Sequence, residues 1–204
     1  MFSIEFSRMF NVMCMEQFWG GFSGFVIGIG LSAACGFRII VPFLGLSIAA
    51  MNGIIQLTPE FQWIGTETAL WAFATAAVLE VGAYYIPWMD NLLDAVATPL
   101  AVVAGIIATA SVMTDTSPFL KWAIALIAGG GMAGTIQAGT ALLRGMSTVS
   151  TGGAANVFIS TAELVGSIMT TLLSLLLPVL AFIVAVIVAV WIMIKLMRRR
   201  PRSA

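Results

Sequence analysis

The chain has 204 residues, of which 60% are hydrophobic and 9% are charged, and its mean hydropathy is +1.05. Soluble domains carry roughly 25% charged residues, so this chain cannot cover a globular surface with polar groups. Its nine basic and nine acidic residues balance to a net charge of zero, which excludes the basic surface of a conventional nucleic-acid binder. We therefore predict an all-α, polytopic membrane helical bundle whose partner is the lipid bilayer, with no nucleic-acid partner.

The sequence contains no histidine, which removes the commonest general base and the commonest metal ligand. It also shows no nucleophile–base set, no nucleotide-binding glycine loop and no zinc-protease motif. We expect a protein that is not an enzyme and that has no cofactor and no metal site. The enzyme alternative is an aspartyl-type membrane hydrolase that uses Asp90 and Asp94.

A bilayer core needs about 20 mostly apolar residues per helix, and this length divides the chain into segments. Residues 1–17 mix apolar and charged side chains, as an interfacial amphipathic segment does, whereas residues 18–195 form a single transmembrane domain. Its first 40 residues predict two membrane segments, 18–36 and 39–57, with irregular backbone between them. The later segments are expected at 66–86, 94–113 and 118–143, followed by a partial helix, 156–171, that leads into a full span, 172–195.

Counting the last pair as one crossing predicts six crossings, although five or seven also fit the two long apolar stretches. Five of the nine basic residues lie at Lys195, Arg198, Arg199, Arg200 and Arg202. Such a cluster beside a span marks the cytoplasmic side, so residues 196–204 are read as a basic cytoplasmic tail. With six crossings both termini and the 58–65 and 114–121 loops lie inside, and the breaks at 84–91 and 144–156 lie outside. We expect the inner membrane of a bacterium.

A weak internal repeat supports this layout. Pro59 to Trp63 and Pro118 to Trp122 share a Pro-x-x-x-Trp pattern, and each follows a run that begins with proline. Proline opens helices well and tryptophan favours the headgroup level, so two separate membrane entries can also look alike. Internal repeats are frequent in transporters, where the binding site lies at the repeat interface.

Four charged residues are expected at membrane depth, namely Arg38, Glu80, Asp94 and Glu163. A charge there is unfavourable by several kcal/mol unless it is paired or hydrated, so each residue is a candidate for an ion or solute pathway. An internal ion pair that fixes helix register is the structural alternative. If Arg38 pairs with one carboxylate, the other two are protonated, face water or meet a cation.

The break at residues 84–91 joins interfacial aromatics to acidic residues. Pro87 is expected to stop the third helix, and Asp90 and Asn91 to cap the fourth. Asp90 and Asp94 are spaced i, i+4 and would share a helix face as a cation or proton site. The candidate gating residues of this break are Tyr84, Tyr85, Pro87 and Trp88.

The break at residues 144–156 is rich in hydroxyls and glycine. It reads equally as an extracellular loop or as a re-entrant turn whose amides and hydroxyls hold a small polar group. Arg144 would favour an anionic group there, and Glu163 lies seven residues after Asn156 on one face of the partial helix. The candidate gating residues of this break are Ser147, Thr148, Thr151, Gly152 and Gly153.

Four stretches together carry a family resemblance: Gly30-Leu-Ser-Ala-Ala-Cys-Gly-Phe-Arg38, the run from Pro42 to Ala49, Tyr84-Tyr-Ile-Pro-Trp-Met-Asp-Asn91 and Ser147-Thr-Val-Ser-Thr-Gly-Gly153. They resemble the landmarks of a group of bacterial integral membrane proteins catalogued only as a domain of unknown function. The resemblance covers roughly residues 25–180. It implies that these stretches hold the functional site, and it implies no substrate.

The broken helices and buried charges of both signs favour a small transporter or channel for an ion or a small polar or anionic solute. Its pathway would be lined by Arg38, Glu80, Asp90, Asn91, Asp94, Arg144 and Glu163. The chain is short, so a pathway of any width would need a homo-oligomer. The alternatives are a membrane scaffold or accessory subunit with structural ion pairs, and a lipid-handling protein in which Arg38 and Arg144 hold a phosphate.

Overall fold

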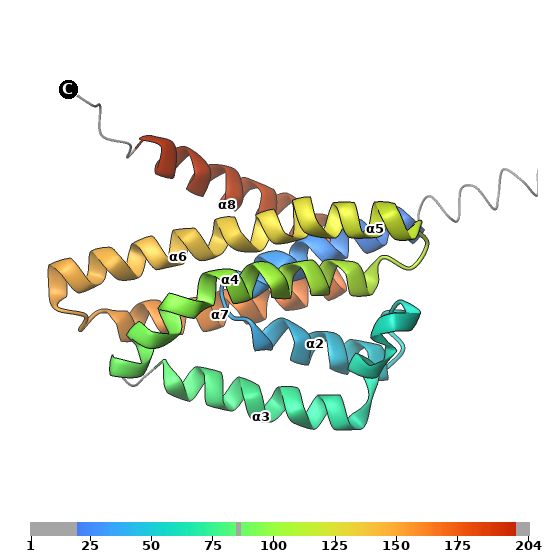
Figure 1. Ribbon diagram of the computed structural model, residues 1–204, viewed down its shortest axis with the longest axis horizontal. Coiled ribbons are helices and arrows are strands. Elements are labelled where there is room, and N and C mark those ends of the chain that lie inside the picture. The colour runs from blue at the N-terminus through green and yellow to red at the C-terminus, as the bar shows by residue number, and fades with distance from the viewer. Residues whose placement is uncertain (1–19, 85–86, 199–204) are drawn as a thin grey trace, which may run out of the picture.

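The computed structural model describes residues 20–84 and 87–198, apart from the side chains of residues 87–95, 196 and 198. The described residues form an elongated bundle of helices without strands, and most helices run along its long axis (Figure 1). After a first helix, Gly20–Cys35, come α2 (Ile40–Met51), the 3-10 helix η1 (Pro59–Gly65), α3 (Glu67–Ala83), α4 (Pro87–Val112), α5 (Pro118–Ile124), the π-helical turn η2 (Ala125–Gly129), α6 (Gly130–Thr151), α7 (Asn156–Leu176) and α8 (Pro178–Arg198). The predicted all-α bundle is confirmed. The predicted interfacial segment, residues 1–17, lies outside the described residues.

The first helix and α2 form a hairpin whose tip lies inside the bundle (Figure 1). The first arm begins beside the 114–117 loop, where Gly21 lies against Asp115, and the second arm returns to pack on η1 at the same end. α2 has only 12 residues, about 18 Å, which is shorter than the roughly 30 Å of a bilayer core. Residues 20–51 therefore form a hairpin, which we describe as re-entrant because α2 alone is too short to span the bilayer. The predicted break between the two segments is confirmed, and the predicted start of the first segment lies outside the described residues.

Local sequence explains where α3 and α4 begin. The hydroxyl of Thr66 accepts a hydrogen bond from the amide of Ala69, and this N-cap starts α3. α4 begins at Pro87, a residue whose missing N–H is harmless in a first turn. Asp90, Asn91 and Asp94 therefore lie within the first turns of α4, and the prediction that Asp90 and Asn91 cap it is wrong.

The predicted polar break at 144–156 is much shorter in the structure. α6 continues to Thr151, and the chain leaves the helix only at Gly152 and Gly153, whose φ angles of 64° and 89° need glycine. The hydroxyl of Thr148 donates to the carbonyl of Arg144, and that of Thr151 donates to the carbonyl of Ser147. These hydroxyls bond to carbonyls of their own helix, so of the two alternatives for this break the re-entrant turn is not formed by residues 144–151.

Residues 156–195 form two complete helices rather than a partial helix and a span. α7 and α8 have 21 residues each, and the chain turns between them at Pro178, which cannot continue the hydrogen-bond ladder of α7. Both helices are long and apolar enough to cross a membrane. Each of them could therefore make a crossing of its own, whereas the prediction of six crossings counts the pair as one.

The two ends of the bundle group the loops differently from the prediction. Lys121 forms a 3.0 Å salt bridge with Glu60, which joins the 58–65 and 114–121 segments at one end (Figure 1). α8 runs beside α6 and ends at the opposite end, near the 152–155 turn. The basic C-terminal end of α8 therefore lies on the side of the 84–87 and 152–155 breaks. The prediction that it shares a side with the 58–65 and 114–121 loops is wrong.

The two Pro-x-x-x-Trp segments meet at this first end but lead into different helices. The rings of Phe61 and Trp122 lie 6.4 Å apart. Pro59 opens a 3-10 helix that bends by 66° into α3, whereas Pro118 opens a continuous helical stretch of 34 residues. Their similarity as a repeat is limited to the entry itself.

Small residues let the hairpin, α4 and η2 approach one another closely. A Cβ added to Gly24 would lie 2.6 Å from the carbonyl oxygen of Val112, and one added to Gly129 would lie 2.8 Å from the carbonyl oxygen of Gly105. In lipid, where no hydrophobic force drives helices together, such backbone contact supplies the packing energy. This packing places the first arm of the hairpin against α4, and α4 against η2.

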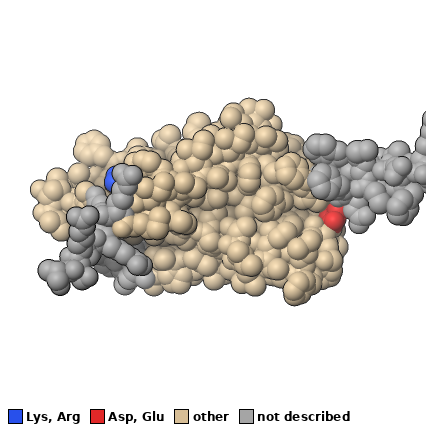
Figure 2. Space-filling view, turned by 90° about the horizontal axis from the view of Figure 1, so that it is seen from above, with Lys and Arg blue, Asp and Glu red and all other residues tan. Residues whose placement is uncertain are grey.

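The outer surface of the bundle is that of a multi-pass membrane protein. Three described helical stretches are long and apolar enough to cross a bilayer, and the bent pair of η1 and α3 makes a fourth. Figure 2 shows one face on which coloured charges appear only near its two ends. α8 exposes large apolar side chains to the surroundings, among them Ile187, Val190 and Met193. Six crossings remain a prediction.

Candidate functional site

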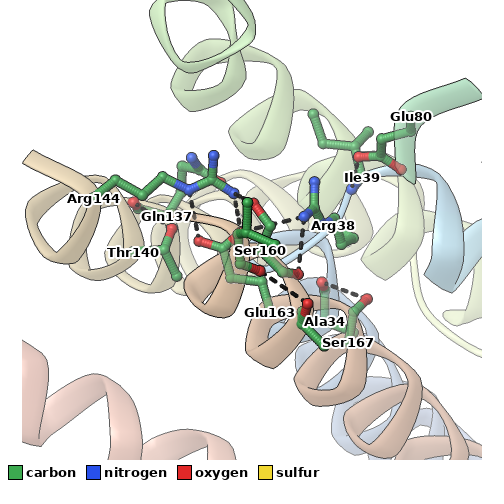
Figure 3. A network of polar contacts seen from close by, with 12 residues as sticks. Ala34, Arg38, Ile39, Glu80, Gln137, Thr140, Arg144, Ser160, Glu163 and Ser167 are labelled. Carbon is green, nitrogen blue, oxygen red and sulfur yellow. Dashed lines mark hydrogen bonds and ion pairs between the residues drawn. The ribbon is translucent and has the colours of Figure 1, made fainter. Parts of the chain in front are cut away.

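Three buried charged residues, Arg38, Arg144 and Glu163, gather around the tip of the re-entrant hairpin (Figure 3). Four elements contribute to this hairpin-tip cluster, which we define as Arg38, Glu80, Tyr84, Arg144, Ser160 and Glu163. Arg38 comes from the tip, Glu80 and Tyr84 from the end of α3, Arg144 from α6, and the last two from α7. Three of the four charges predicted at membrane depth thus lie in one cluster.

Glu163 is the carboxylate that two arginines share. The Nε of Arg144 donates to Oε1 of Glu163 over 3.0 Å, and its Nη2 forms a second bond to Oε2. The Nη2 of Arg38 lies 3.6 Å from the same Oε2. All three side chains are at most 5% exposed, so water does not screen these charges.

The last turn of α3 holds the hairpin tip in place. The two carboxylate oxygens of Glu80 accept hydrogen bonds from the amides of Ile39 and Ile40, at 2.8 and 3.0 Å. These amides begin α2, so Glu80 caps a short helix inside the bundle, where a negative charge is stabilised. Four residues later, the ring of Tyr84 stacks 3.7 Å from the guanidinium of Arg38 and 4.3 Å from that of Arg144.

Arg38 is incompletely satisfied. Its Nη2 donates to the carbonyl of Ser160 over 3.0 Å, but its Nε and Nη1 have no hydrogen-bond partner among the described residues, and the residue is 2% exposed. Buried guanidinium N–H groups without partners are rare, because leaving one unpaired is unfavourable by about 1–3 kcal/mol or more. The tip therefore presents donors that a bound anion or an ordered water would satisfy.

The remaining predicted site residues fall into two groups, one at the end of α6 and one whose side chains lie outside the described ones. Ser147, Thr148, Thr151, Gly152 and Gly153 form the last turns and the end of α6 and are not part of the cluster. The side chains of the first α4 turns lie outside the described ones, and so does Tyr85, so nothing places them relative to the cluster. These residues are Tyr85, Pro87, Trp88, Asp90, Asn91 and Asp94.

Sequence reasoning missed Ser160 and Ser167. The hydroxyl of Ser160 accepts from Arg144 over 3.3 Å, and the hydroxyl of Ser167 donates to the carbonyl of Ala34 over 3.1 Å. The available signal was a polar stripe at helical spacing, all of it buried: Asn156, Ser160, Glu163, Ser167, Thr171 and Ser174. A helix in lipid turns such a stripe toward its protein neighbours rather than toward acyl chains.

Comparison with known proteins bears on family rather than on chemistry. No curated protein and no solved structure matched the chain. One family model matched, described as a domain of unknown function (DUF4126), and the match covers residues 25–199. It includes most of the hairpin, the whole hairpin-tip cluster and α8, and it confirms the resemblance to a domain of unknown function seen in the sequence. The chain therefore belongs to the family of integral membrane proteins that share this domain of unknown function, DUF4126.

Proposed function

We propose that this protein is a small membrane transporter or channel in which the hairpin-tip cluster binds an anionic solute. The observation that carries the proposal is the buried guanidinium of Arg38, with Nε and Nη1 unpartnered among the described residues at the tip of a re-entrant hairpin. Irregular backbone at membrane depth is tolerated where it is buried in protein or lines a pathway. Transporter sites are commonly built from such broken helices.

The capped start of α2 supports this proposal. In transporters the N-terminus of a half-helix commonly faces the anionic group of the substrate. Here the carboxylate of Glu80 occupies that position, with one oxygen on each of two amides. Glu80 thus acts as an internal anion. Protonation of its carboxylate, or its displacement from the two amides by the carboxylate of a solute, would release the hairpin tip.

The proposal extends to the setting of the protein. A bacterial inner membrane fits the family resemblance, and the Lys and Arg residues that follow Ile194 favour a cytoplasmic C-terminus. The chain is short, so a pathway of any width would need a homo-oligomer. With that orientation the 84–87 and 152–155 breaks face the cytoplasm.

Anion flux into proteoliposomes tests the proposal. The anions compared are chloride, nitrate, phosphate and acetate, and the variants are Arg38→Lys, which keeps the charge but loses the planar fork, and Arg38→Gln. Each hydrogen bond to a charged group contributes about 1.5–3 kcal/mol, so either change should reduce flux of the favoured anion by about tenfold or more.

Lys121→Gln is the matched control, because its salt bridge with Glu60 lies at the end of the bundle away from the 152–155 turn. It should leave flux unchanged. The transport proposal fails if no anion crosses, or if Arg38→Lys carries the favoured anion as fast as the unaltered protein.

The scaffold alternative rests on a specific observation, the paired geometry of Arg144 and Glu163. A protein whose charges only join helices would lose folded expression on Glu163→Gln and regain it when Arg144→Gln is added. It would show no anion flux in any variant.

A further inference from the structure

A groove on the outer surface of the bundle lies between α6 and α8. α8 leans away from α6 toward its C-terminal end (Figure 1), and the space between them, about 180 Å³, is lined by one face of each helix. α6 contributes Gly139, Thr140, Leu142, Leu143 and Met146, α8 contributes Val188, Trp191, Ile192 and Lys195, and Phe37 of the hairpin forms the inner end.

The lining is apolar except at one end. The hydroxyl of Thr140 donates to the carbonyl of Gln137 in its own helix, so it makes no demand on an occupant. At the inner end the helices touch, since a Cβ on Gly139 would lie 2.8 Å from Ile192. From Val188 to Lys195 the groove follows two turns of α8, about 10 Å. Its shape and lining suit a hydrocarbon chain.

The outer end of the groove carries a charge. The ammonium of Lys195 lies 4.6 Å from the ring centroid of Trp191, which is 59% exposed. Tryptophan and lysine together mark the headgroup level of a bilayer. The sequence continues from there with Arg198, Arg199, Arg200 and Arg202, a run that attracts the anionic lipids of a cytoplasmic leaflet.

We propose that this groove binds one anionic glycerophospholipid, with an acyl chain between α6 and α8 and the phosphate at Lys195. The site is separate from the hairpin-tip cluster and does not depend on transport. The occupant would nevertheless touch Phe37, the residue next to Arg38, so the lipid would brace the hairpin tip from outside.

Native mass spectrometry of the full chain tests the proposal after exchange into micelles with equal phosphatidylglycerol and phosphatidylcholine. The unaltered protein should retain phosphatidylglycerol in preference to phosphatidylcholine. Val188→Trp fills the groove and should remove bound lipid of both kinds, whereas Val190→Trp, on an exposed position outside the lining, should retain it.

Lys195→Gln tests the headgroup contact, and it changes an exposed residue. It should lower the preference for phosphatidylglycerol about fivefold, the contribution of one basic residue near an anionic surface. Lys121→Gln, at the other end of the bundle, should not change it.

Three results would overturn the proposal. One is equal retention of the two lipids by the unaltered protein. Another is equal lipid retention by Val188→Trp and Val190→Trp. The third is a lipid-free dimer that Val188→Trp dissociates, which would assign the groove to a second copy of the chain.

Discussion

The two arginines of the hairpin-tip cluster should be coupled unequally to Glu163. Arg144 makes two hydrogen bonds to this carboxylate. Arg38 lies 3.6 Å from one of its oxygens and donates its hydrogen bond to the carbonyl of Ser160 instead. Glu163→Gln removes the carboxylate that both buried guanidinium groups contact. Removing one partner of a buried ion pair is unfavourable by about 3–5 kcal/mol, so the free energy of unfolding should fall by that amount.

A double-mutant cycle separates the two pairings. Coupling between contacting residues spans about 0.5–3 kcal/mol, and we expect the Arg144–Glu163 pair near the top of that range and the Arg38–Glu163 pair near about 1 kcal/mol. The first value should exceed the roughly 0.6 kcal/mol average of interhelical hydrogen bonds in membranes, because both groups are ionised and the contact is bidentate.

Denaturant unfolding in detergent micelles measures these energies. The variants are the single and paired Gln substitutions at Arg38, Arg144 and Glu163. Equal coupling for the two pairs would refute the assigned geometry. So would a Glu163→Gln variant as stable as the unaltered protein, since its carboxylate would then not be holding two buried cations.

Three further predictions follow from the packing and the topology. Glu80→Leu should lower the free energy of unfolding by about 3 kcal/mol and Glu80→Gln by about half of that, because Gln keeps one acceptor for the α2 amides; unfolding in micelles compares them, and equal losses would contradict the cap. Gly129→Ala should lower the free energy of unfolding by about 1–3 kcal/mol, because its Cβ would lie 2.8 Å from a backbone carbonyl oxygen. Gly131→Ala, where no atom lies within 4 Å, should be neutral or stabilising by up to about 1 kcal/mol. Thermal melts that rank the two variants the other way would exclude the close approach at Gly129. In a Cys14→Ser background, an impermeant maleimide should label Ser117→Cys in intact cells but Ala154→Cys only after permeabilisation. The α4–α5 loop and the α6–α7 turn that hold these positions lie at opposite ends of the bundle, and the basic end of α8, on the side of the α6–α7 turn, is expected inside. The reverse labelling pattern would invert the topology.

Composition and periodicity predicted the class of the fold but not its path. The 60% hydrophobic content and the length of the apolar runs predicted an all-α membrane bundle. They did not predict the hairpin, because a run of 40 apolar residues reads equally as two spans or as two arms that turn inside the bundle. The 12-residue length of α2 can be recognised only when its start is known, and that start is capped by Glu80 of α3, about 40 residues further along the chain.

The hydroxyl-rich end of α6 shows why composition misled. Ser147, Thr148 and Thr151 suggested a loop because such residues compete for backbone hydrogen bonds. In the structure Thr148 and Thr151 bond to carbonyls one turn back, a pattern compatible with an intact helix. Only Gly152, with its positive φ, ends it.

The candidate site was predicted in its members but not in its pairings. Arg38, Glu80 and Glu163 stood out because charges at membrane depth need a reason. Arg38 was expected to pair with one of the carboxylates, and it does approach Glu163, but the second partner of Glu163, Arg144, was not foreseen because α6 extends two turns further than predicted. Pairing depends on where helices end, which is the least certain feature of a sequence pattern.

Anomalous diffraction from crystals of the protein soaked in bromide tests the central claim most directly, because bromide is a monovalent anion that can be located by its scattering. The account predicts a peak within hydrogen-bonding distance of Nε or Nη1 of Arg38, and its loss in Arg38→Lys. An ordered Arg38 whose Nε and Nη1 both donate to groups of the protein itself, with bromide bound only elsewhere, would contradict it.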